Sequence, residues 1–107
     1  MKNYRVKITK EAISDMEGLY RYIAEVLHSP ENALKQYDRI ADAILSLEKM
    51  PDRFGLFESE PEHSLKIHKM VIDNFIVCYM IDTETVTVTD ILYGASDIHT
   101  KLQLRHL

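Results

Sequence analysis

Hydrophobic and polar residues alternate near the start of the chain, in the segment YRVKIT. Tyr4, Val6 and Ile8 fall on one side of this segment, and Arg5 and Lys7 fall on the other. A period of two residues is typical of a strand with one buried face. We therefore predict a strand close to the N-terminus.

After this strand the apolar positions recur every three or four residues, which is the spacing of a helix. Thr9 can cap a first helix, and Ser29 with Pro30 predicts the start of a second. Pro51 stops the second helix. The connection between them is short, which makes them antiparallel, so residues 10–49 are predicted to form a helical hairpin that covers one face of a sheet.

The remaining pattern predicts a loop followed by three strands. Residues 51–64 mix Pro, Gly and acidic residues and are expected to form an exposed connection. Strands are expected over about residues 64–71, 74–81 and 85–92, because turns of hairpin length separate these apolar runs. They form an antiparallel meander, and a short helix is expected over residues 96–104.

The middle strand of this meander is apolar on both faces. One of these faces consists of Ile76, Cys78 and Met80. The helical hairpin can cover only one side of a sheet, so we expect a central strand that is covered twice. The second cover is either the C-terminal helix or a partner protein.

An acidic residue interrupts the last predicted strand. Asp90 falls on the same side as Val86, Val88 and Leu92, which are apolar. Burying an unpaired carboxylate is costly, so we expect a bulge or the strand end to turn Asp90 to solvent.

Composition narrows the class of protein. The chain has 107 residues, of which 46% are hydrophobic and 28% charged, as in ordinary globular domains, so one domain over residues 1–107 is expected. A net charge of −4 argues against direct DNA binding, which depends on neutralising phosphates.

The lone Cys78 suits a reducing cytoplasm, and the absence of a long apolar run argues against a membrane-spanning helix. The histidines lack ligand spacing, so we expect no metal and no cofactor.

The order of these elements and several local segments resemble the RelE/ParE superfamily of toxins from bacterial type II toxin–antitoxin systems, which includes plasmid stabilisation proteins. The resemblance rests on YRVKITKEAISDMEGLYRYI, SPENALKQYDRIADAILSLEKMPDRFG, LKIHKMVIDNFIVCYMID and ILYGASDI. It implies an α+β fold with the helices packed on one face of the sheet. It also implies a toxin that a cognate antitoxin neutralises. The positions that carry it are Ala12, Tyr22, Ile23, Pro30, Ala33, Ile44, Leu47, Pro51, Gly55, Tyr79, Gly94 and Asp97.

Nuclease members of this superfamily cut messenger RNA on the ribosome without a metal, using basic side chains. The arginine positions that the resemblance implies fall at Ile76 and at Ala95 or Ser96, so both cations are missing. An RNA-cutting activity would have to use other groups. The candidates for catalysis in that case are Lys66, His68 and His99.

The missing cations and the long helical hairpin favour the ParE branch, whose members, the resemblance implies, inhibit DNA gyrase by protein contact. Two alternatives stay open: a ribosome-dependent mRNA endonuclease like RelE, and a non-toxic relative that acts only as a binding module. The predicted surfaces for an antitoxin or another partner are Tyr20, Tyr22 and Tyr37 on the hairpin and Ile76 and Met80 on the sheet.

Overall fold

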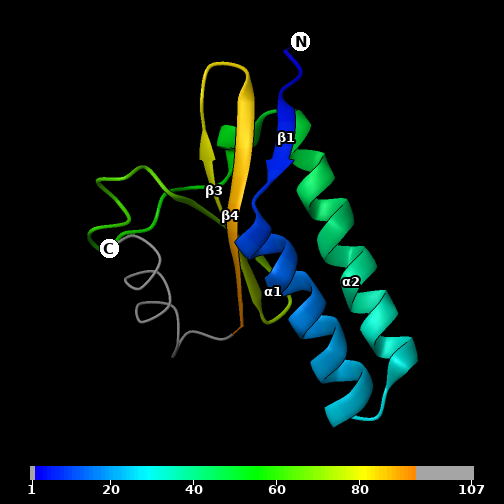
Figure 1. Cartoon of the computed structure of the whole chain (residues 1–107). Helices are drawn as coiled ribbons and strands as arrows, with labels where there is room; N and C mark the ends of the chain where they lie inside the picture. The colour runs from blue at the N-terminus through cyan, green and yellow to red at the C-terminus, as the bar shows by residue number, and fades with distance from the viewer. Residues whose placement is uncertain (1, 94–107) are drawn as a thin grey trace.

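The computed structural model describes residues 2–93 (Figure 1). Two helices lie on the same side of a four-stranded sheet, which confirms the predicted α+β fold and the helical hairpin. The predicted C-terminal helix lies outside the described residues. In chain order the elements are β1 (Arg5–Ile8), α1 (Lys10–Arg21), the π-helical turn η1 (Tyr22–Val26), α2 (Pro30–Leu45), the 3₁₀ turns η2 (Ser46–Glu48) and η3 (Pro51–Arg53), β2 (His68–Ile72), β3 (Phe75–Ile81) and β4 (Thr85–Tyr93).

The strands are arranged in the order β1-β4-β3-β2. β2, β3 and β4 form the predicted antiparallel meander, and β1 pairs in parallel with β4. The prediction that β2 starts at residue 64 is wrong, because the strand begins at His68. Residues 61–66 form a turn instead, in which Lys66 has a left-handed backbone with φ of 59°. This conformation is incompatible with an extended strand.

The two helix starts differ in how they are capped. The Thr9 hydroxyl accepts a hydrogen bond from the Ala12 amide at 3.1 Å, as predicted, and donates to the Thr89 carbonyl at 3.2 Å. The same side chain therefore starts α1 and ties it to β4. Ser29 occupies the N-cap position of α2 but makes no capping bond with its side chain. Pro30, whose backbone is restricted to helical φ, opens that helix.

The main core lies between the hairpin and the sheet. Ala12 from α1 and Ile40 from α2 are completely buried against Val77 and Val88 of the central strands. Each large side chain removed from water in this way contributes on the order of 1.5–3 kcal/mol. The buried members of this core are Ala12, Met16, Ile40, Ile44, Leu47, Met70, Phe75, Val77, Tyr79, Val86, Val88 and Ile91.

A second, smaller core lies on the reverse face of the sheet. Cys78 and Leu92 from the sheet pack there with Phe57 and Ile67, and Ile76 is partly buried against them. The Phe57 amide donates to the Ile67 carbonyl at 3.0 Å, which closes the connecting segment over the sheet. The prediction of a doubly covered central strand is confirmed. The chain's own loop supplies part of the second cover, so the expectation that residues 51–64 are simply exposed is wrong.

A bulge in β4 changes which residues face the helices. Cys78 of β3 lies opposite Asp90, whereas the next residue of β3 lies opposite Val88, so Thr89 is the extra residue. After this point Ile91 faces the main core and Leu92 faces the reverse core. The predicted bulge is therefore present. The predicted exposure of Asp90 is wrong, because its side chain is completely buried, and Leu92 does not share a face with Val86 and Val88.

An ion pair fixes the middle of α2 to the turn between β2 and β3. The Arg39 guanidinium donates to both carboxylate oxygens of Asp73, at 2.9 and 3.0 Å. These hydrogen bonds, together with one from Gln36, lower the pKa of the Asp73 carboxyl. The hydrogen bonds to Asp73 and its charge raise the pKa of Arg39. Within residues 2–93 no helix is long and apolar enough to cross a membrane.

Candidate partner-binding surface

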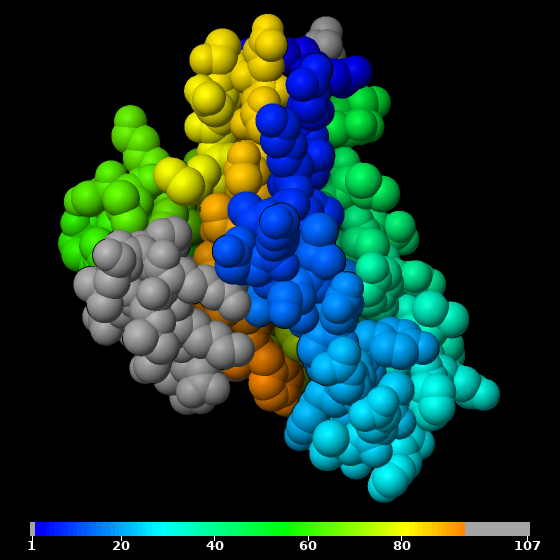
Figure 2. Space-filling model, in the orientation of Figure 1, coloured from blue at the N-terminus to red at the C-terminus, as the bar shows by residue number. Residues whose placement is uncertain are grey.

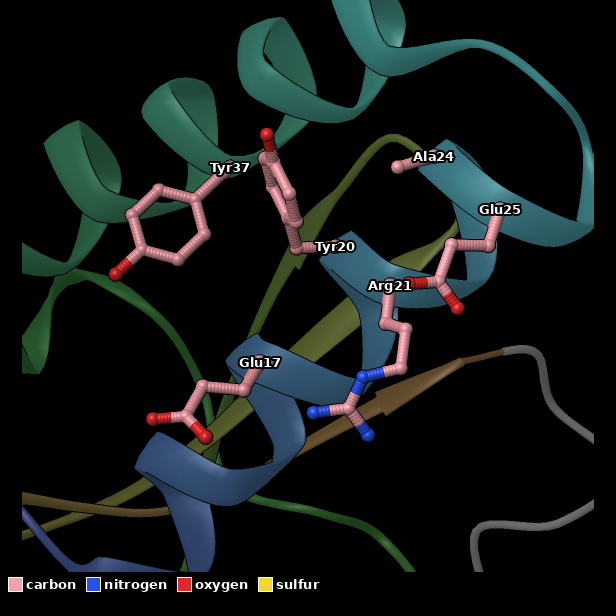
Figure 3. Close-up of a pocket in the computed structure, with 6 residues that line it drawn as sticks. All are labelled: Glu17, Tyr20, Arg21, Ala24, Glu25 and Tyr37. Carbon is pink, nitrogen blue, oxygen red and sulfur yellow. The ribbon is translucent and has the colours of Figure 1, made fainter.

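Two of the three predicted tyrosines meet on the outer side of the hairpin. Tyr20 of α1 and Tyr37 of α2 pack edge to face, with ring centroids 6.2 Å apart and an interplanar angle of 89° (Figure 3). They line a hollow of about 440 Å³ together with Ala24 and three charged residues. Tyr20 is 38% exposed and Tyr37 is 36% exposed, so part of each side chain is open to solvent.

The charged residues of this hollow are arranged along α1 and η1. Glu17 and Glu25 lie one helical turn on either side of Arg21 (Figure 3). Residues at this spacing can pair, yet Arg39–Asp73 is the single ion pair found within residues 2–93. The rim of the tyrosine hollow therefore offers both signs of charge for contacts with another protein.

Tyr22 lies in a second and larger hollow. This groove of about 740 Å³ runs between the end of the hairpin and the end of the sheet, and Phe75 and Tyr93 form part of its wall, with their ring centroids 5.1 Å apart. Tyr22 is 49% exposed and Tyr93 is 58% exposed. The structure thus separates Tyr22 from Tyr20 and Tyr37. Phe75 belongs to the main core and reaches the groove from inside, whereas Tyr93 is exposed and follows directly after the strand predicted over about residues 85–92.

The hairpin ends in a π-helical turn that no sequence signal indicated. The Leu27 amide donates to the Tyr22 carbonyl at 3.2 Å, five residues back, instead of four. Such wide turns occur frequently at functional sites. Here the turn precedes a left-handed residue, His28, and leaves Val26 59% and Leu27 55% exposed at the tip. The apolar pair directly before His28 was the available signal for this exposed tip.

The two sheet residues predicted to contact a partner differ in exposure. Ile76 packs against the reverse core, and so its side chain is partly covered by the chain itself. Met80 lies four residues further along β3, on the same face, and is 36% exposed. Of these two residues, Met80 is the more accessible to a partner.

Two of the three predicted basic candidates lie at the start of β2. Lys66 is exposed in the left-handed turn before β2, and His68 is the first residue of that strand. His99 lies outside the described residues. The strand predicted over about residues 64–71 would have contained both residues, but only His68 lies on it.

The imidazole of His68 is held by contacts within the protein. Its Nδ1 donates to the Phe54 carbonyl at 2.7 Å, and its ring stacks on Tyr79 with centroids 5.0 Å apart. The Tyr79 hydroxyl in turn donates to the Pro51 carbonyl at 2.6 Å, and burial raises the pKa of Tyr79 to about 12. These contacts join β2 and β3 to the segment that follows α2. Within residues 2–93, no group of three or more His, Cys, Asp and Glu side chains is arranged to hold a metal ion.

Comparison with known families gives one match that spans most of the chain. A model described as "ParE toxin of type II toxin-antitoxin system, parDE" matches residues 6–98. A sequence search of curated proteins gave no match.

Several solved structures share the fold. The chromosomal ParDE toxin–antitoxin system from P. aeruginosa has a TM-score of 0.72 and 19% identity, over 86% of this chain and 97% of that chain. The RelE–RelB complex from Pyrococcus horikoshii has a TM-score of 0.60 and 16% identity, over 88% and 98%. The toxin–antitoxin complex RelBE2 from Mycobacterium tuberculosis has a TM-score of 0.56 and 22% identity, over 90% and 97%.

Proposed function

The chain belongs to the ParE family of toxins from type II toxin–antitoxin systems, and we propose that it arrests growth by binding DNA gyrase through protein contacts. The family resemblance supplies gyrase as the target. The surface chemistry of the described residues supports contact with a protein: exposed tyrosines and apolar side chains gather on the hairpin and its tip. Aromatic side chains of this kind are enriched where proteins bind each other.

One observation carries the choice of protein contact over RNA cleavage. Ile76 stands on the central strand where the nuclease pattern has an arginine, and it packs against Phe57, Ile67 and Leu92. A phosphoryl transfer without a metal needs cations placed beside the reacting phosphate. An apolar side chain at this position, closed over by the chain's own loop, supplies none.

We further propose that a cognate antitoxin neutralises the toxin by occupying these surfaces. The solved relatives from P. aeruginosa, P. horikoshii and M. tuberculosis are toxin–antitoxin systems or complexes by their descriptions. The 740 Å³ groove between the hairpin and the sheet has an apolar wall formed by Leu19, Ile23 and Phe75. A partner helix with an apolar face fits such a groove.

A purified system tests the gyrase proposal. Gyrase and relaxed plasmid are incubated with the chain, and the proportion of supercoiled product is measured. We expect inhibition by the wild type and a loss of about tenfold or more in potency for Tyr20→Ser/Tyr37→Ser, because interface tyrosines often dominate binding. Val71→Ser removes an apolar residue that is 61% exposed on β2, away from the hairpin, and serves as the control.

The same preparation tests the runner-up activity. Translating ribosomes loaded with messenger RNA are exposed to the chain, and the RNA ends are mapped. The proposal requires intact RNA. The contrary result has two parts: the wild type cuts the RNA without affecting supercoiling, and the Lys66→Ala/His68→Ala variant does not cut it. That result would show ribosome-dependent cleavage and would exclude gyrase binding as the activity.

A further inference from the structure

Exposed apolar side chains form a line along the outer side of the hairpin. Residues of one helix that lie three, four, seven or eight positions apart share a face. One such stripe lies on α1 and another on α2, and the ring contact between Tyr20 and Tyr37 joins them. We call the five exposed members of these stripes the outer seam: Ile13, Tyr20, Leu34, Tyr37 and Leu45, which are between 36% and 62% exposed.

The outer seam lies on the side of the helices that faces away from the sheet. Ala12 and Met16 of α1 and Ile40 and Ile44 of α2 point the other way, into the main core. Figure 2 shows the blue residues of α1 and the cyan to green residues of α2 side by side at the surface, and in this view no strand or loop of the described residues lies over them. A partner that covers such a line of apolar side chains removes it from water, which favours binding.

The contact between the two tyrosines also aligns the stripes along the helices. Because the helices are antiparallel, residues before Tyr20 on α1 lie at the height of residues after Tyr37 on α2. Ile13 stands seven positions before Tyr20, and Leu45 stands eight positions after Tyr37. With a rise of about 1.5 Å per residue, Ile13 and Leu45 lie at nearly the same height.

This alignment makes the outer seam complementary to itself. A second copy can pack seam to seam about a twofold axis parallel to the helices, so that α1 of each copy faces α2 of the other at the same height. Tyr20 then meets Tyr37 of the second copy, and Ile13 meets Leu45 of the second copy. The twofold symmetry makes each of these contacts twice.

Two charged residues beside the outer seam favour the same arrangement. Arg21 lies eight positions after Ile13 and Asp38 lies four positions after Leu34, so each shares the face of its stripe. Both side chains are exposed, and the Arg39–Asp73 ion pair, the single one within residues 2–93, contains neither. In the twofold arrangement Arg21 of one copy lies within about 3 Å, along the helix axis, of the height of Asp38 of the other. Opposite charges thus face each other twice.

We propose that a second copy of this chain covers the outer seam, so that the two hairpins form a four-helix interface. Arg21 of each copy pairs with Asp38 of the other beside the tyrosines. The inference does not rest on the proposed function. Where both hold, gyrase and the second copy compete for Tyr20 and Tyr37, and self-association lowers the amount of chain that is free to bind gyrase.

Sedimentation velocity of the purified full chain over a range of concentrations tests the apolar part of the interface. We expect a monomer–dimer equilibrium with a dissociation constant on the order of 10 µM at about 0.1 M salt. Leu45→Ser should weaken the dimer about tenfold or more, because it removes an apolar contact twice. Val71→Ser is the matched control, since Val71 is 61% exposed on β2 and Leu45 is 62% exposed. A wild type that stays monomeric far above the expected constant, or an equal effect of both substitutions, would overturn the inference.

Two charge variants test the orientation of the copies. Arg21→Asp alone and Asp38→Arg alone place like charges opposite each other, and each should weaken its own dimer about fivefold or more. An equimolar mixture of the two variants should recover dimers, because opposite charges face each other at both contacts of the mixed pair. Recovery also shows that both variants are folded.

A mixture that dimerises no better than the separate variants would contradict the proposed arrangement, provided that circular dichroism shows both variants folded. Recovery should disappear at about 1 M salt, where exposed charges are screened. Gyrase is absent from these measurements, so their result is independent of the supercoiling assay.

Discussion

The imidazole ring of His68 lies nearly parallel to the phenol ring of Tyr79, with centroids 5.0 Å apart and an interplanar angle of 15°. Together with the hydrogen bond from Nδ1 to the Phe54 carbonyl, this stacking gives His68 a structural role at the start of β2. The histidine that sequence reasoning offered as a catalytic candidate therefore has a measurable alternative role in stability.

Replacing His68 should reduce stability more than it changes activity. His68→Ala removes the stacking contact and the hydrogen bond to Phe54, and we expect the free energy of unfolding to fall by about 1–3 kcal/mol. Urea denaturation measures this change. Lys66→Asn, which tolerates the left-handed backbone at that position, should cost about 0.5 kcal/mol or less. A fully stable His68→Ala variant that has lost growth arrest would contradict the structural role.

Tyr79 predicts a pH dependence in the alkaline range. Its folded-state pKa is raised from 10.0 to about 12 by burial, so its contribution to stability is present below about pH 10 and is lost as the pH rises through the folded value. Tyr79→Phe should lose about 1 kcal/mol at neutral pH, because the hydrogen bond to Pro51 is gone. Unfolding measured at several pH values should show the wild type losing its advantage between pH 10 and pH 12. If the free energy of unfolding falls equally steeply with pH in the wild type and in Tyr79→Phe, ionisation of Tyr79 does not cause the loss of stability.

Asp73 predicts the opposite dependence, at acidic pH. Hydrogen bonds from Arg39 and Gln36 lower its pKa in the folded state, so the stability it contributes is present above the unfolded pKa and is lost as the pH falls through the folded value. Asp73→Asn keeps a residue that tolerates the left-handed turn, where φ is 55°. It should be less stable than the wild type at neutral pH and equally stable in strong acid. Asp38→Asn is the control, an exposed substitution on α2. Its stability relative to the wild type should not change in this way between neutral pH and strong acid.

Restoring a cation at Ile76 should not create a nuclease. Ile76→Arg places a charge against Phe57 and Ile67, and we expect a loss of about 1–2 kcal/mol in the free energy of unfolding. Met80→Arg, on the same face at an exposed position, should cost about 0.5 kcal/mol or less. Mapping of transcript ends should find no cuts for either variant. New cuts with Ile76→Arg would show that the remaining residues hold a usable active site.

Local patterns predicted much of the fold. The alternation in β1, the Thr9 cap and the apolar spacing of the hairpin depend on residues close together in the chain, and each is present in the structure. The meander followed for the same reason, since short turns leave adjacent strands little choice of partner. The parallel pairing of β1 with β4 joins residues about eighty positions apart, and no local signal specified it.

The errors come from single residues that change the periodicity. Thr89 adds one residue to β4, which moves Asp90 and Leu92 to the reverse face, although the sequence alternates without interruption. Phe57 lies in a loop whose Pro, Gly and acidic residues indicated exposure to solvent, yet its side chain is buried against the sheet. Tyr20 and Tyr37 meet at one hollow, and their contact with a partner stays a prediction. The π-helical turn that exposes Val26 and Leu27 depends on hydrogen-bond geometry that composition does not encode.

Gyrase binding is best tested by inducing expression of the chain alone in a bacterium and following growth, transcript ends and plasmid supercoiling in the same culture. We expect growth arrest with altered supercoiling and intact transcripts, and release from arrest in the Tyr20→Ser/Tyr37→Ser variant but not in Val71→Ser. Arrest with cut transcripts and normal supercoiling, or unimpeded growth with the folded protein present, would contradict it.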